Sequence, residues 1–145
     1  MPRVVFYLIR GGERAREGFL LNFLEQKILA RGWDALVITA PGKADELDER
    51  LWTARAGNFI PHARTNAFNA EDNTPVLIAE SGEDAPAAAN VLILWGGDVP
   101  DDISAFGHIV IAPPDDDTLR QQKAIFADRG CEINIHNIAN AISAG

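Results

Sequence analysis

Short, continuous runs of apolar residues recur along the chain, and they constrain its fold more than any other feature. Each run is rich in β-branched or aromatic side chains and stops at a glycine, a proline or a charged residue, which is typical of buried strands. The runs are VVFYLI (4–9), ALVITA (35–40), PVLIAE (75–80), VLILW (91–95) and HIVIA (108–112). Because strands without polar alternation are buried on both faces, we predict a mainly parallel sheet with helices on each side.

Segments of helical periodicity separate these strands. Leu20, Leu24 and Ile28 fall on one face of a helix predicted over residues 13–30. Two further helices are predicted over residues 44–52 and 118–129.

The last predicted strand, residues 131–138, has a different pattern. Ile133 and Ile135 alternate with polar residues, which predicts a half-exposed edge of the sheet. The chain shows no internal repeat and no linker, so residues 1–145 are assigned to a single three-layer, Rossmann-like α/β domain.

The charges of the chain, which total −8, are unevenly distributed. Residues 1–64 hold ten basic and eight acidic side chains, residues 65–119 hold eleven acids and no base, and residues 120–145 hold three bases and two acids. A broad nucleic-acid footprint needs clustered cations, so the acidic middle argues against direct binding of nucleic acid. The two ends of the chain leave room for a small cationic patch.

The segments that follow the strands carry no known cofactor motif. IRGGERARE (9–17) fits neither the G-x-G-x-x-G nor the G-x-x-x-x-G-K-[ST] phosphate-binding pattern. The single cysteine, Cys131, is expected to be a packed thiol, and the aspartates at 115–117 are expected to cap a helix. The histidines lie in separate segments without ligand spacing, at His62, His108 and His136. We therefore expect no metal and no cofactor, and a binding role in place of catalysis.

The N-terminal segment MPRVVFYLIR has an apolar run that is too short to span a membrane. It also lacks the small-residue cleavage site of an export signal, and one cysteine allows no internal disulfide. We expect a cytoplasmic protein with no membrane contact.

The stretch LDERLWTARAGNFIPHA (47–63) places large apolar side chains near and beyond a helix end. Trp52 ends the short helix, and a phenylalanine, an isoleucine and a proline follow at 59–61 in a predicted loop. Side chains of this kind form either an exposed patch that awaits a partner or a small core beneath the loop, and both interpretations stay open.

Several segments together resemble the chi subunit of bacterial DNA polymerase III. LDERLW followed by FIPHA is similar to the family's signature, an L-D-x-x-L-W helix followed by F-x-P-H. The segments VVFYL, PVLIA, VLIL, VPDDISAFGHIVI and the D-D-x-L-R pattern extend the resemblance, in order, over nearly the whole chain. The resemblance implies a non-catalytic accessory subunit of the clamp-loader complex. It also implies two partners, the psi subunit and the acidic C-terminal tail of single-stranded-DNA-binding protein.

Two sets of site residues follow from the resemblance. The surface facing psi or the clamp loader would comprise Leu51, Trp52, Phe59, Ile60, Pro61 and His62. The tail site would use basic residues of the last helix, where Arg120 and Lys123 are spaced i, i+3 and so share one side. Phe126 or Ile125 would line an apolar hole for the tail's terminal phenylalanine.

The alternative reading is a small α/β enzyme that acts on a nucleotide or a phosphorylated metabolite. Such an enzyme needs a glycine-rich junction between a strand and a helix, or converging acids, and neither is visible in the sequence. A phosphoacceptor domain would need an aspartate at the end of a central strand, where this chain has Ala40, Glu80, Trp95 or Ala112.

Overall fold

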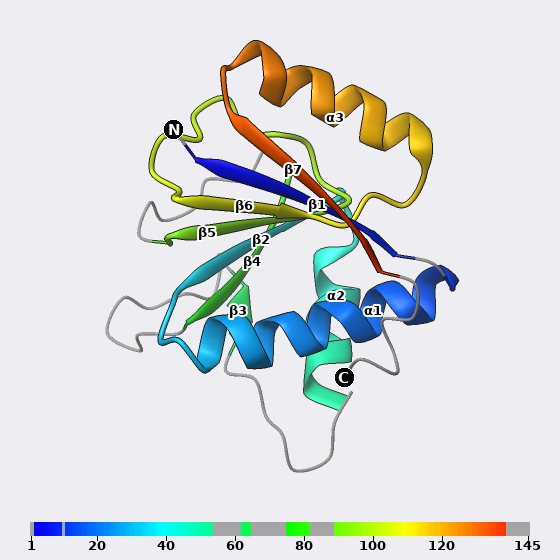
Figure 1. The fold of residues 1–145 in the computed structure, drawn as a ribbon. Coiled ribbons are helices and arrows are strands. Elements are labelled where there is room, and N and C mark those ends of the chain that lie inside the picture. The colour runs from blue at the N-terminus through cyan, green and yellow to red at the C-terminus, as the bar shows by residue number, and fades with distance from the viewer. Residues whose placement is uncertain (1, 10, 54–61, 65–74, 82–88, 139–145) are drawn as a thin grey trace.

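The structure, a computed structural model, describes residues 2–9, 11–53, 62–64, 75–81 and 89–138, with the backbone alone at 52–53 and 63–64. Within this part of the chain, seven parallel strands form one sheet in the order β3-β4-β2-β5-β6-β1-β7 (Figure 1). The strands are β1 (Arg3–Ile9), β2 (Ala35–Thr39), β3 (His62–Arg64), β4 (Val76–Glu80), β5 (Val91–Trp95), β6 (His108–Ile111) and β7 (Glu132–Ile138). The predicted parallel α/β sheet is confirmed.

The central strands are apolar at successive positions because both of their faces are covered. Every residue of β2 is buried, and so are the first four residues of β4 and of β5. Across the sheet, Val37 of β2 lies beside Ile78 of β4 and Ile93 of β5. The neighbouring positions Leu36 and Leu92 are buried on the opposite face. Two-sided burial therefore explains the continuous apolar runs of the sequence.

One face of the sheet carries helices from the N-terminal half of the chain (Figure 1). These helices are α1 (Gly12–Phe23), its continuation η1 (Leu24–Leu29) and α2 (Ala44–Thr53). Leu20, Leu24 and Ile28 from the first two, with Leu47 and Leu51 from α2, pack against the sheet in one cluster. Apolar side chains at helical spacing thus cover the strands, as the periodicity predicted.

The opposite face is covered in part by α3 (Asp116–Asp128) (Figure 1). Asp115 begins this helix as its N-cap, because its side chain accepts a hydrogen bond from the Thr118 amide at 2.7 Å. The same contacts with Thr118 lower the pKa of the Asp115 carboxyl. Further along the helix, Phe126 is fully buried and meets Phe6 of β1 edge-on, with 6.3 Å between ring centroids.

Two features of the fold depart from the prediction. The helix expected over residues 13–30 changes to π-helical bonding at η1, where the amide of Ala30 donates to the carbonyl of Glu25. It ends in a cap at Gly32, where the amides of Gly32 and Trp33 donate to the carbonyls of Leu29 and Ile28. The short strand β3 was not predicted. By contrast, β7 is a half-exposed edge strand as expected, with Ile135 39% exposed. Among the described helices, none has the length and apolar character needed to cross a bilayer.

We expect the substitution Phe126→Ala to lower the free energy of unfolding by about 3–5 kcal/mol, because it opens a cavity beneath α3. Urea denaturation followed by circular dichroism measures this change. Lys123→Ala is the matched control on the same helix, since its side chain is exposed, and it should change stability by less than about 0.5 kcal/mol. A small effect of Phe126→Ala would show that α3 is not anchored by this ring.

Candidate functional site

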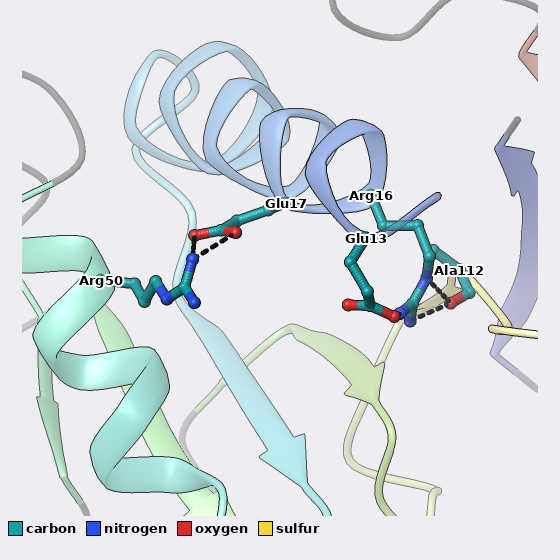
Figure 2. A network of polar contacts seen from close by, with 5 residues as sticks. All are labelled: Glu13, Arg16, Glu17, Arg50 and Ala112. Carbon is teal, nitrogen blue, oxygen red and sulfur yellow. Dashed lines mark hydrogen bonds and ion pairs between the residues drawn. The ribbon is translucent and has the colours of Figure 1, made fainter. Parts of the chain in front are cut away.

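The segment LDERLW (47–52) lies on α2, and several of its side chains bind within the chain. Leu47 and Leu51, four residues apart, point into the core and are 7% and 4% exposed. Arg50 reaches α1, where its Nη1 donates to both carboxylate oxygens of Glu17 at 3.0 and 2.9 Å (Figure 2). Leu51, expected at a partner surface, is therefore a core residue that supports α2 from within.

A contact between Asp48 and His62 joins the two halves of the signature. His62 is the first residue of β3, and its backbone pairs with Val76 of β4. Its side chain is fully buried, with Nε2 at 3.1 Å from Oδ1 of Asp48 on α2. The residue that closes F-x-P-H is thus held against the helix that carries L-D-x-x-L-W. Because its side chain has no accessible surface, His62 can serve a partner surface only by positioning the chain.

The remaining residues of the expected partner surface are Trp52, Phe59, Ile60 and Pro61. Phe59, Ile60 and Pro61 lie outside the described residues, and Trp52 is described by its backbone alone, in the last turn of α2. The described contacts nevertheless fix both flanks of this segment, through Leu51 in the core and His62 beside Asp48.

Arg16 occupies the carboxyl edge of the sheet, where open α/β sheets usually bind their ligands. It is only 8% exposed, and its Nη2 and Nε donate to the carbonyl oxygen of Ala112, just beyond β6, at 2.7 and 3.3 Å (Figure 2). Its guanidinium also lies over the ring of Trp95 at 4.6 Å and pairs with Glu13 at 2.7 Å. A cavity of about 550 Å³ remains in front of this network.

The charges around this cavity largely neutralise one another. Arg16 pairs with Glu13, and Arg50 pairs with both Glu17 and Glu46. Lys43 also lies 3.8 Å from Glu46. These contacts stabilise the carboxyl edge of the sheet, because Arg50 joins α2 to α1 and Arg16 joins α1 to the end of β6.

The tail-site residues expected on α3 take different positions on the helix. Arg120 and Lys123 are exposed, and Arg120 pairs with Asp117 one turn earlier. Phe126 has no accessible surface, because its ring packs against Phe6. The expected place of Phe126 at a peptide surface is therefore corrected, because the ring is buried, whereas its neighbour Ile125 is 37% exposed.

A cavity of about 250 Å³ lies between α3 and the segment that follows β5. Its lining includes Thr118, Gln122 and Ile125 from one side of α3, with Val99 opposite them. Arg120, Lys123 and Phe126 are not among the residues that line it. Beyond Ile125, Arg129 donates to the carbonyl of Pro100 at 2.7 Å and holds this segment against the helix. This cavity and the predicted cations thus lie on different sides of α3.

Two side chains that hold these sites in place, Arg16 and Asp48, were not predicted from the sequence. Arg16 looked like one basic residue among several on an amphipathic helix, and its burial depends on Ala112, far away in sequence. Asp48 and His62 both belong to the signature, so their joint presence was the available signal for a contact. Among the described residues, no group of three or more His, Cys, Asp or Glu side chains could hold a metal ion.

Comparison with known proteins identifies the family of this chain and a relative in that family. The family model described as "DNA polymerase III chi subunit, HolC" matches residues 1–133, which include α2 and α3. A protein of Haemophilus influenzae (strain ATCC 51907 / DSM 11121 / KW20 / Rd) named "DNA polymerase III subunit chi" is 31% identical over 80 residues. That alignment covers 55% of each chain, so this chain spans about half the length of the relative that it matches.

We expect Arg16→Met to destabilise the fold by roughly 1–3 kcal/mol, because it leaves the buried Ala112 carbonyl without its donor. Methionine keeps most of the apolar stem, so the measured loss reports on the polar contacts. Arg14→Met, an exposed position on the same helix, should alter stability by no more than about 0.5 kcal/mol. Equal denaturation midpoints for the two variants would refute the role given to Arg16.

Proposed function

Because the chain belongs to the chi-subunit family of DNA polymerase III, we propose that it is an accessory subunit linking the clamp-loader complex to single-stranded-DNA-binding protein. The observation that carries this proposal is the family match over residues 1–133. In this role the chain is non-catalytic and acts in the cytoplasm as part of the holoenzyme.

We assign the contact with psi or the clamp loader to Trp52, Phe59, Ile60 and Pro61. Support comes from their immediate neighbours, because Leu51 anchors the end of α2 in the core and the Asp48–His62 contact brings the start of β3 to the same helix. Large aromatic and aliphatic side chains at the centre of an interface usually carry much of the binding energy.

We assign capture of the acidic tail of single-stranded-DNA-binding protein to α3. Arg120 and Lys123 supply exposed positive charge, and Ile125 supplies an exposed apolar side chain beside the cavity bounded by Val99. A terminal carboxylate and the acids before it favour such cations through charge-assisted hydrogen bonds. The cavity, at about 250 Å³, is smaller than the roughly 300–1,000 Å³ of typical small-molecule pockets.

Trp52→Ala should leave folding intact and abolish capture of clamp-loader subunits from native lysate, with a loss of about 2 kcal/mol or more in binding free energy. The adjacent substitution Leu51→Ala is the comparison, because it should cost about 2–5 kcal/mol of folding stability. Thermal unfolding and pull-down of the same samples separate the two effects. If Trp52→Ala unfolds the chain as Leu51→Ala does, the indole belongs to the core and the surface assignment fails.

For the tail site, we expect the double variant Arg120→Ala/Lys123→Ala to weaken binding of a labelled acidic peptide ending in phenylalanine by about tenfold per lost charge-assisted contact. Wild-type affinity should fall steeply as salt is raised, and amidation of the peptide's terminal carboxylate should weaken it. Ile125→Asp tests the apolar contact, and Arg14→Ala is the distant charge control. Unchanged affinity in the α3 variants would remove the site from this helix.

A further inference from the structure

A groove of about 460 Å³ lies on the sheet face beside η1, towards the β7 edge. Its floor consists of residues from four adjacent strands, β5, β6, β1 and β7. Arg3 of β1 lies between His108 of β6 and Glu132 of β7, and four residues further along β1 Tyr7 lies beside His136. Central strands carry apolar residues on this face, so the polar and aromatic floor marks where the core ends.

Aromatic rings form two stacked pairs in the groove. Tyr7 and His136 stack with 5.6 Å between centroids and 22° between planes, and His136 is exposed. Trp33 and His108 stack at 5.2 Å and 14°. Imidazole and aromatic faces that are open to solvent are the surfaces on which nucleobases stack.

The groove is positively charged although the chain as a whole is acidic. Its lining holds three cations, Arg3, Lys27 and Arg31, and a single acid, Glu132. Glu132 lies 3.5 Å from Arg3 at the rim. Lys27 and Arg31 lie on the wall formed by η1 and the turn after it, and the Arg31 guanidinium is 5.0 Å from the Trp33 ring centre. All three cations come from the N-terminal third of the chain, whereas the C-terminal strand β7 contributes Glu132, Asn134 and His136. The groove is therefore not the cationic patch from both chain ends for which the sequence left room.

We propose that this groove binds one nucleotide, with the base on the His136–Tyr7 stack and the phosphate beside Lys27 and Arg31. Asn134 lies on the floor of the groove, on β7 between Glu132 and His136, and its side-chain amide can hydrogen-bond to the edge of the base. The volume is that of a small-ligand site, so it supports one local contact and no broad footprint on nucleic acid. A free nucleotide and one nucleotide of a single strand present the same chemistry. The proposal does not rest on tail capture by α3.

The test uses the full chain with three probes: a short labelled oligothymidylate, thymidine monophosphate and inorganic phosphate. Fluorescence anisotropy measures the first and calorimetry the other two. Lys27→Ala/Arg31→Ala should weaken oligonucleotide binding about tenfold or more and reduce the salt slope by roughly 0.7 per lost phosphate contact. His136→Ala should weaken both nucleotide probes about fivefold or more through lost stacking. The matched control is Arg14→Ala/Lys43→Ala, which removes two exposed cations elsewhere and should change neither.

The proposal is supported if either nucleotide probe binds and the groove variants weaken that binding while the control does not. The probe that binds more tightly shows whether the natural ligand is a free nucleotide or a nucleotide of a single strand. Three results overturn the proposal: no effect of the groove variants, equal affinity for inorganic phosphate and the monophosphate, or displacement of nucleotide by the acidic peptide. The last result would reassign the groove to a peptide. Arg120→Ala/Lys123→Ala should leave nucleotide binding unchanged, so failure here is distinct from failure of the tail site on α3.

Discussion

Burial of the central strands on both faces is the constraint from which the rest of the structure follows. Once β2, β4 and β5 must be apolar at successive positions, a polar side chain fits among them only at a strand end, as Thr39 does by donating its hydroxyl to the Ala40 carbonyl. Polar and charged side chains that could bind a ligand or a partner therefore lie at the carboxyl edge of the sheet, at its two lateral edges and on the outer sides of the helices. Arg16, the Asp48–His62 contact and the groove beside β7 all lie at such margins.

The signature segment is recognisable largely because it is structural. Leu47 and Leu51 bury one side of α2, Arg50 ties it to α1, and Asp48 ties it to His62 at the start of β3. Within LDERLW, these contacts engage Leu47, Asp48, Arg50 and Leu51 inside the chain. The described part of the signature therefore has a structural role in this fold.

The central strands and the helices could be predicted because their burial patterns are continuous or periodic in the sequence. The strand β3 could not, since HAR has no apolar run and its pairing with β4 is made by the backbone. On α3, Ile125 and Phe126 are adjacent and both apolar. Which of the two is exposed depends on how the helix is rotated about its axis, and the contact with Phe6 buries Phe126. The sequence could place Arg120 and Lys123 on one side of a helix. It could not predict their position relative to the cavity, because that cavity also depends on Val99 in the segment after β5.

The π-helical turn at η1 affects which side chains of this helix face the groove beside β7. Bonds from residue i to i−5, as from Ala30 to Glu25, take up about one more residue per turn than ordinary α-helical bonds. Upstream, Leu20 and Leu24 are locked in the core. Deleting one residue from η1 would restore regular winding there and rotate Arg31 by about a hundred degrees relative to that core. The angular offset between the buried stripe and the charged wall is thus set by a single inserted residue.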